Sequence, residues 1–386
     1  MHYLIRPARA EDNNGILGLI RETPQPGRVL LNFEREPRFF DGSQVTCEEP
    51  DNWVVETRGG GGSQRPPDHA QADQVETAHF ELPRDRRIVG TFSIGRRAMY
   101  INGKVQRIRY ANDLRLAPDL QGGRMLLRMA RKLAEQMGTD EWMQTVILSD
   151  NRTSLNTVAS GRAGLPTYYP CGEIETSMLF SYPRRRRHGL RVRRASIDDL
   201  ADMQHWLDEQ GPRRQFFPRY RLENLLAGDD YYRGLKIDDF WLALRGGQLV
   251  GMLGIWNQKS FKQTRVLAYP RGLSWLRHFY NLYTALYGGI RLPPAGGTLS
   301  YLTLHSVLVE NDDAAIFDAL LAAVMQEYLP RFGALISGFF QGDPLARALE
   351  GCRRQVMHSR HFLASYGDDP RQQLDGRLPY VEVARL

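Results

Sequence analysis

The chain has 386 residues, enough for two or three domains, and its 42% hydrophobic and 25% charged residues are typical of a globular protein. No apolar stretch is long and uncharged enough to span a bilayer, and no signal peptide is recognisable, so we expect no membrane span. The net charge of +7 comes almost entirely from arginine.

The arginine excess fits either a polyanionic partner or a GC-rich genome, and we favour the genome. No finger, helix-turn-helix or basic-aromatic pattern supports a nucleic-acid partner, whereas a small anionic ligand such as a nucleotide cofactor would suit a basic cleft. Three distant cysteines, Cys47, Cys171 and Cys352, form neither a disulfide framework nor a metal-ligand set. We therefore expect a protein without a metal, in a reducing bacterial cytoplasm.

The first half predicts strands and helices in alternation. Acidic Glu11 and Asp12 open a helix after a first strand, where the helix dipole favours them. Asn102-Gly103 is typical of a tight hairpin turn. The predicted strands are residues 3–8, 53–57, 88–94, 105–117, 142–148 and 174–182, with helices after residues 10, 124 and 150.

Two segments differ from this pattern. Residues of about 58–86 are rich in Gly and Pro and poor in large apolar groups, which indicates a mobile insertion. Residues 184–189 contain four arginines and read as a linker. A patch for an acidic partner is the alternative, but a solvated junction is the simpler interpretation.

The most informative stretch is residues 107–133, where a strand is followed by Gln121-Gly122-Gly123 and then an amphipathic helix. Strand, glycine-rich turn and helix leave backbone N–H groups exposed at the helix N-terminus. Such a terminus binds phosphate or pyrophosphate. On its own, a pair of glycines before a helix is more often an ordinary loop.

After the linker the pattern repeats. Residues 190–203 resemble 4–17 in layout, 249–255 resemble 88–94, and 299–328 resemble 107–137. A strand over 335–340 with a helix from 344 resembles 142–163. Four correspondences in the same order indicate a tandem duplication. The second copy has Glu310-Asn311-Asp312-Asp313 in place of the glycine-rich turn, and these acidic side chains would repel a pyrophosphate. We therefore expect no nucleotide site there.

The order of predicted elements, which is strand, helix, strand, hairpin, glycine-rich turn, helix, strand, helix and strand, occurs twice and resembles the GNAT superfamily of acyl-CoA-dependent N-acyltransferases. The first copy carries the resemblance in Arg6-x-Ala8, Leu114 to Pro118, Gln121 to Leu126, Asn151-x-x-Ser154 and Gly164-Leu165. In the family's pyrophosphate loop Gln121 matches, whereas Arg124 and Leu126 stand where small residues are usual. Gly122 and Gly123 serve instead if the turn is shifted by one position.

The resemblance implies an α/β (α+β mixed) fold of two tandem GNAT-like domains, each a mostly antiparallel twisted sheet with helices on both faces. The expected domains are residues 1–183, which bind CoA, and 190–386, which have lost the cofactor loop. The implied activity is transfer of an acetyl or other acyl group from acyl-CoA to a primary amine on a small molecule or peptide. A catalytically inactive CoA sensor or protein-interaction module is the alternative, and a homodimer is left open.

The resemblance also implies roles for residues. The fourth and fifth strands of this fold separate, so pantetheine would pair with the backbone at Leu114 and Leu116. The amides of Gln121, Gly122, Gly123, Arg124 and Met125 would bind the pyrophosphate, and Asn151 would face the pantetheine arm or adenine. An N-cap role for Asp150 or Asn151 is the alternative.

An amine must lose a proton before it attacks a thioester. Asp113 is our first choice for the base, with Asn112 positioning a water, although a solvated carboxylate at a strand edge is the simpler interpretation. The family's usual acid is a tyrosine in the helix over residues 152–163. That helix contains none. Tyr168 or Tyr169 is the candidate replacement, although thiolate can leave without an acid because of its modest pKa. The acceptor is not predicted. The aromatic stripe of Leu276, Phe279, Tyr280 and Tyr283 indicates first a core or interface, and an apolar wall for a longer acyl chain or a sugar-like acceptor is the alternative.

Overall fold

The computed structural model describes residues 2–24, 30–58, 86–138, 140–182, 189–269, 273–287 and 289–386. Most of the predicted insertion at about 58–86 and of the predicted linker at 184–189 lies outside the described residues. Both therefore stay predictions, as does the division of the chain into two domains.

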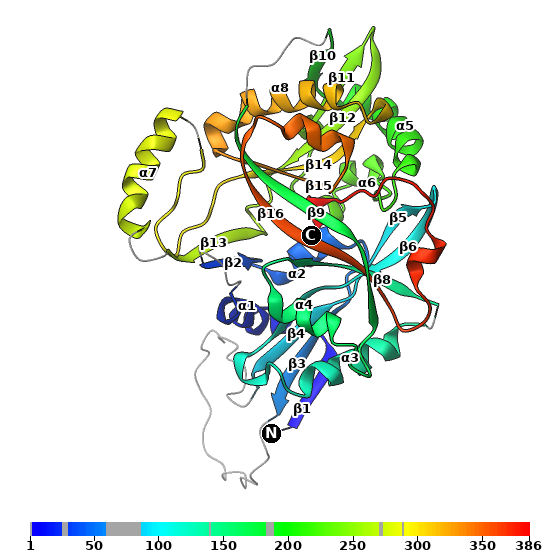
Figure 1. Cartoon of the computed structure of the whole chain (residues 1–386), viewed down its shortest axis with the longest axis vertical. Coiled ribbons are helices and arrows are strands. Elements are labelled where there is room, and N and C mark those ends of the chain that lie inside the picture. Colours follow the sequence, from blue (N-terminus) through cyan, green and yellow to red (C-terminus); the bar gives the residue numbers. More distant parts are fainter. Residues whose placement is uncertain are drawn as a thin grey trace, which may run out of the picture.

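The described chain is a mixed α/β fold, as predicted (Figure 1). Its strands are β1 (His2–Pro7), β2 (Leu30–Glu34), β3 (Asn52–Arg58), β4 (Ile88–Ser93), β5 (Arg96–Ile101), β6 (Lys104–Tyr110), β7 (Asn112–Leu116), β8 (Trp142–Leu148), β9 (Thr167–Ser181), β10 (Arg191–Arg194), β11 (Phe240–Arg245), β12 (Gln248–Trp256), β13 (Gln263–Ala268), β14 (Leu302–Val309), β15 (Leu335–Phe340) and β16 (Arg353–Ser365). Its α-helices are α1 (Asn13–Glu22), α2 (Phe39–Thr46), α3 (Met125–Gln136), α4 (Arg152–Ala159), α5 (Leu200–Gln210), α6 (Leu222–Leu226), α7 (Leu273–Tyr287) and α8 (Ala314–Phe332).

The first strands form an antiparallel sheet in the order β1-β3-β4-β7, with α1 and α3 on opposite faces. On one face Lys132 of α3 lies 5.5 Å from the centre of the Trp53 ring. On the other, α1 approaches so closely that a Cβ at Gly15 would lie 2.7 Å from Ile88 Cγ1. Alternate residues of a strand point to opposite faces, so the same sheet supports both helices.

A ten-stranded sheet passes through both halves in the order β10-β11-β12-β14-β15-β9-β16-β8-β6-β5. The last strand of each half lies beside strands of the other half. β9 pairs with β15 of the second half, and β16 lies between β9 and β8 of the first (Figure 1). The two halves therefore share one continuous hydrogen-bonded sheet.

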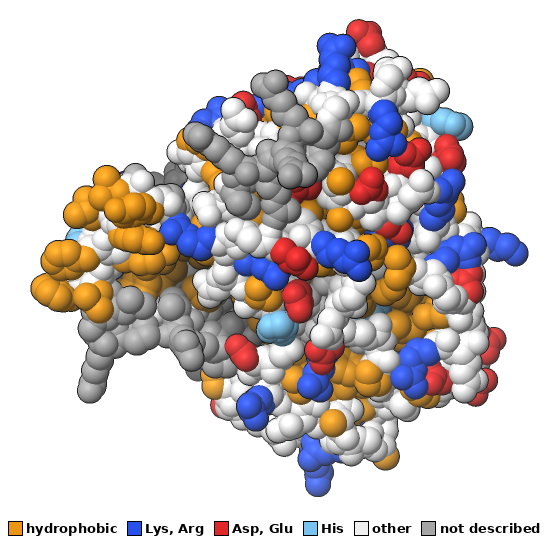
Figure 2. Space-filling model, turned by 45° about the horizontal axis from the view of Figure 1, so that its top comes forward, with side chains coloured by type: hydrophobic (Ala, Val, Ile, Leu, Met, Phe, Trp, Pro, Cys, Tyr) orange, Lys and Arg blue, Asp and Glu red, His pale blue; other side chains and the backbone are white. Residues whose placement is uncertain are grey.

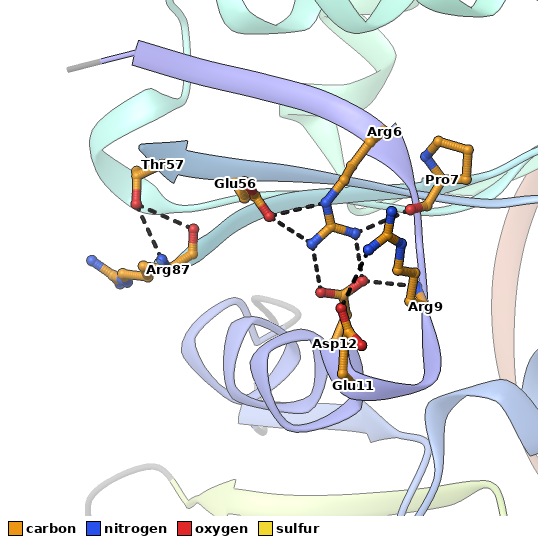
Figure 3. Close-up of polar contacts among 8 residues, drawn as sticks. All are labelled: Arg6, Pro7, Arg9, Glu11, Asp12, Glu56, Thr57 and Arg87. Carbon is orange, nitrogen blue, oxygen red and sulfur yellow. Dashed lines mark hydrogen bonds and ion pairs between the residues drawn. The ribbon is translucent and has the colours of Figure 1, made fainter. Parts of the chain in front are cut away.

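The two halves repeat in detail. Arg6 donates to Asp12 Oδ2 at 2.7 Å, and Arg193 donates to Asp199 Oδ2 at the same distance. Each carboxylate also accepts the backbone N–H three residues earlier, that of Arg9 or Ser196. In the first half Arg6 also binds Glu56 (Figure 3). The same arginine–aspartate contacts at corresponding positions of the two halves support the predicted internal repeat.

The Arg6–Asp12 pair predicts a pH-dependent stability. Burial opposes ionisation of Asp12, but the hydrogen bonds from Arg6 and the Arg9 N–H outweigh it and lower the pKa of this carboxyl. A lowered pKa in the folded state adds stability above the unfolded-state pKa, and this stability is lost as the pH falls through the folded-state value. We expect Asp12→Asn to lower the free energy of unfolding by about 1–3 kcal/mol at pH 7. In urea titrations the difference should shrink below pH 4. A constant difference from pH 7 to pH 3 would contradict this assignment.

The three largest hydrophobic clusters among the described residues hold the fold. One packs α8 on β11, β12 and β14, a second surrounds Phe217 and Trp256, and a third joins α1 and α3 to the first sheet.

The predicted hairpin turn is confirmed, because Asn102 and Gly103 both have positive φ, at 52° and 76°. β2 and α2 were not predicted, and β2 pairs with β13 of the second half. Among the helices described, none has the length and apolar character needed to cross a bilayer.

Candidate active site between β7 and β8

The strands β6 and β8 run parallel and then separate. They pair at Arg109↔Met143 and Tyr110↔Gln144, and Ala111 N donates to Gln144 O at 2.8 Å. Beyond this point β7 pairs with β4, and β8 continues beside β16. Among the described residues, the edge of β7 that faces away from β4 has no partner strand. The predicted separation is therefore confirmed, whereas the binding roles of Leu114 and Leu116 stay predictions.

A β-bulge marks the point of separation. The register shifts between Thr91 and Ser93, so that Asp113 and Leu114 together face a single residue of β4. Asp113 takes the left-handed conformation, with φ of 50°, and Leu114 remains 51% exposed at the open edge. An exposed leucine beside unpaired backbone groups is the arrangement that an added extended chain would cover.

The loop after β7 presents unpaired amides. A short 3₁₀ turn, Pro118–Leu120, precedes Gln121, and α3 begins at Met125. Gly122 has φ of +75°, which favours glycine. The N–H groups of Gly122, Gly123 and Arg124 have no acceptor in the part of the chain that the structure describes. Together with the first turn of α3 they form a concentration of donors at a helix N-terminus.

The side chains of this loop differ in accessibility. Gln121 donates back to Leu116 O at 3.1 Å, whereas the Met125 side chain is buried. Arg124 is exposed, and Arg128 donates to Tyr3 O. A diphosphate fits this donor set, because a Cβ at Gly122 would meet no atom within 4 Å and the amides lie open.

The second half has the same bulge, in β14, but the space between β14 and β15 is filled. β14 pairs with β15 only at Leu302↔Leu335 and Thr303↔Ile336, and the bulge residue Ser306 has φ of 51°. Residues 380–386 of the same chain occupy the space beyond. Glu382 Oε2 accepts from Ser306 N at 2.8 Å, and Tyr380 OH accepts from Val307 N at 3.1 Å. On the β15 side, Gly338 leaves room for Val383.

In the second half, the turn between β14 and α8, residues 310–313, is also occupied by contacts within the chain. Asp312 accepts from Arg214 at 2.6 Å, Glu310 pairs with Arg245 at 2.9 Å, and Asp313 caps α8 by accepting from Ala315 N. Asn311 and Asp312 both have positive φ. In place of open glycine amides, this turn therefore carries carboxylates that are held by arginines of the same chain and, at Asp313, by the N–H of Ala315.

Asn112 and Asp113 are consecutive residues of β7, and their predicted catalytic roles stay predictions. Asn112 Nδ2 donates to Asp113 Oδ2 at 3.0 Å. Sequence reasoning missed Arg35, whose Nη2 donates to both Asp113 oxygens at 3.1 and 3.0 Å. Arg35 lies between β2 and α2, in a stretch broken by Pro and Gly that gave no motif. An approaching ammonium group would share this carboxylate with a guanidinium.

Lys262 is a second basic group that sequence reasoning missed. Burial, helped by the positive charge of Arg35 and opposed by Asp113, lowers the pKa of Lys262 to about 7. Its Nζ donates to the backbone oxygen of Leu386. The only signal in the sequence was the rarity of lysine in an arginine-rich chain.

Tyr168 and Asn151 have clear structural partners. Tyr168 packs edge-on against Phe362, with ring centres 6.2 Å apart, and burial raises the pKa of Tyr168 to about 12. It makes no hydrogen bond to Asn112 or Asp113 within the described chain. Asn151 accepts from Ser154 N at 3.1 Å and caps α4, which confirms the N-cap alternative. Their predicted roles toward a ligand stay predictions.

Two cavities lie away from the gap between β7 and β8. One of about 230 Å³ is bordered by α1, β3 and the start of β4, and its carboxylates Asp12 and Glu56 are engaged by Arg6 (Figure 3). One of about 20 Å³ lies between β8 and residues 380–386, beside His361, whose pKa is lowered to about 3 by burial and by Arg97. None of the predicted site residues borders either cavity. The described residues contain no cluster of potential metal ligands.

The structure is similar to that of the GCN5-related glucosamine N-acetyltransferase region of a fungal multi-domain GH3 β-N-acetylglucosaminidase. The TM-score is 0.56 at 10% identity, over 94% of this chain and 38% of that chain. The chain has the GNAT fold. Saccharomyces cerevisiae N-myristoyltransferase with bound myristoyl-CoA is also similar, with a TM-score of 0.55 and 8% identity over 98% of this chain and 89% of that chain. No protein-family model and no curated protein sequence matches the chain.

Proposed function

We propose that the first half binds an acyl-CoA in the gap between β7 and β8 and transfers its acyl group to a primary amine. The observation that carries the proposal is the contrast between two equivalent gaps in the GNAT fold. The gap at Asp113 has no partner strand among the described residues and is followed by unpaired amides, whereas the gap at Ser306 is filled by residues 380–386 and is followed by an acidic turn whose carboxylates pair with Arg214 and Arg245. The second half then supports the fold and borders the acceptor site.

Each residue has a simple task in this proposal. The amides from Gly122 to Met125 hold the diphosphate of CoA, and the open edge of β7 pairs with the pantetheine arm. The bound donor supplies a thioester. Asp113 accepts the proton of the amine, with Asn112 fixing the carboxylate, and Lys262 is a second base within the same charge network. Thiolate is a good leaving group because of its modest pKa, so no tyrosine acid is required.

Asp113→Asn tests the chemistry. Asparagine tolerates the left-handed backbone and retains most hydrogen bonds, but it takes up no proton. We expect kcat for CoA release in the presence of an accepted amine to fall about 10²- to 10⁴-fold, with the affinity for acyl-CoA unchanged. Thiol release is measured over a panel of amines with acetyl-CoA and longer acyl-CoAs, and Lys262→Met is measured in parallel. Equal loss of binding and turnover would show that Asp113 is structural.

A CoA-binding sensor without catalysis is the rival function. It is favoured by Arg35, which occupies both oxygens of Asp113, and by the burial of Tyr168 against Phe362. A thermal shift with acyl-CoA, followed by no thiol release from any amine, would support the sensor. We also propose a reducing cytoplasmic setting, because Cys47, Cys171 and Cys352 are all free thiols.

A further inference from the structure

Helix α7 carries its apolar face outward. It stands off one side of the molecule, at the left of Figure 1, and forms the large hydrophobic patch at the left of Figure 2. Trp275 is 70% exposed and Leu286 is 72% exposed. The other exposed members of this patch are Leu276, Phe279, Leu282, Tyr283 and Tyr287. The prediction of a core stripe was therefore wrong for Leu276, Phe279 and Tyr283, and the interface alternative remains.

The polar side of α7 faces the protein. Thr284 is buried, and Asn281 binds both the backbone N and O of Leu292 at 2.9 Å. At 100° per residue, the exposed apolar side chains cover about 140° of the helix, and Asn281 and Thr284 lie on the other side. This orientation is the reverse of that of an ordinary surface helix. A contiguous apolar face of this kind marks an interaction site.

The surroundings of α7 are basic. Residues 240–309 contain no Asp or Glu. Arg277 and His278 lie on the helix, and Arg291 is exposed just beyond it. No carboxylate pairs with Arg277 or Arg291 in the part of the chain described here. The Arg353 guanidinium lies 5.7 Å from the centre of the Tyr283 ring and adds positive charge at the edge of the patch.

We propose that α7 docks this protein on an anionic lipid surface. Leucine and aromatic side chains enter the acyl boundary, while Arg291 beyond the helix and Arg353 at the edge of the patch meet the lipid phosphates. The helix has 15 residues, about 22 Å at 1.5 Å per residue, so it lies in the interface and does not span it. Contact between two copies through this face would bring their like charges together, which favours lipid over self-association.

The tryptophans of this chain provide a direct test. Trp53, Trp142, Trp206, Trp241 and Trp256 are buried, so only Trp275 of the six is exposed. Full-length protein is mixed with vesicles of phosphatidylcholine alone or with 30% phosphatidylglycerol. With the anionic vesicles we expect a blue shift of the fluorescence, protection from a water-soluble quencher, and flotation that weakens with salt. Trp275→Phe should retain flotation and lose the blue shift.

A variant with Trp275, Phe279 and Leu286 all changed to Ser should lose at least tenfold in vesicle binding without a change in melting temperature, since all three are exposed. Matched control changes are Ile197→Ser and Leu226→Ser, which are 56% and 49% exposed on other elements. No flotation of the unmodified protein, equal binding to neutral vesicles, or equal binding by the triple variant would overturn the proposal. A dimer in sedimentation that only the triple variant abolishes would also overturn it, in favour of a second copy.

Discussion

Gly123→Asp is expected to abolish acyl-CoA binding and to leave the fold intact. A Cβ at Gly123 would meet only Leu120 O, at 3.5 Å, and the backbone is not left-handed there, so the side chain fits. Its carboxylate would lie among the unpaired amides before α3. There it would repel a diphosphate and compete for the same N–H donors. We expect the affinity in calorimetry to fall at least 100-fold, with the melting temperature nearly unchanged.

Two controls separate charge from shape and position. Gly123→Asn has nearly the same volume without the charge, so it should retain most of the affinity. Gly376→Asp adds the same charge at another exposed glycine with nothing within 4 Å, and it should bind acyl-CoA like the unmodified protein. If Gly123→Asp bound as tightly as Gly376→Asp, the diphosphate would not lie in this turn.

Glu382→Ala is expected to lower the free energy of unfolding by about 3–5 kcal/mol. Glu382 Oε2 accepts from Ser306 N, Tyr220 OH and Tyr380 OH, at 2.8 to 3.1 Å, and all of these groups are buried. Alanine would leave three buried donors without an acceptor. It would also loosen the segment that fills the second gap. Urea denaturation at pH 7 measures the loss.

Glu382→Gln provides a graded comparison, because the amide oxygen still accepts, and we expect a smaller loss. Glu135→Ala is the matched surface control. Its side chain is 59% exposed and pairs with Lys132, so the expected loss is below about 1 kcal/mol. Equal losses for Glu382→Ala and Glu135→Ala would show that the network around Ser306 adds nothing to stability.

Much of the local structure was predictable because it depends on neighbours in sequence. The strands 142–148 and 335–340 have the predicted bounds, and the Asn102-Gly103 turn has the predicted conformation. Both follow from side-chain periodicity and from the steric freedom of Asn and Gly at positive φ. The separation beside Leu114 was predicted only through the resemblance to a known fold.

The surroundings of the candidate site were not predictable in the same way. Arg35 and Lys262 reach the neighbourhood of Asp113 from segments without a motif, because the contacts join residues far apart in the chain. Asn151 was correctly recognised as a cap candidate, since a cap acts within one helical turn. Tyr168 could not be placed by its distance in sequence alone.

The sequence by itself determined the GNAT-like order of elements, the internal repeat and the contrast between a glycine-rich turn and an acidic one. These are properties of short segments, in which periodicity, turn residues and charge act locally. Only the tertiary structure decided that β9 and β16 are exchanged, that residues 380–386 fill the second gap, and that α7 points its apolar face outward. Periodicity tells which side chains share a face, but the partner of that face depends on which distant segments pack against it.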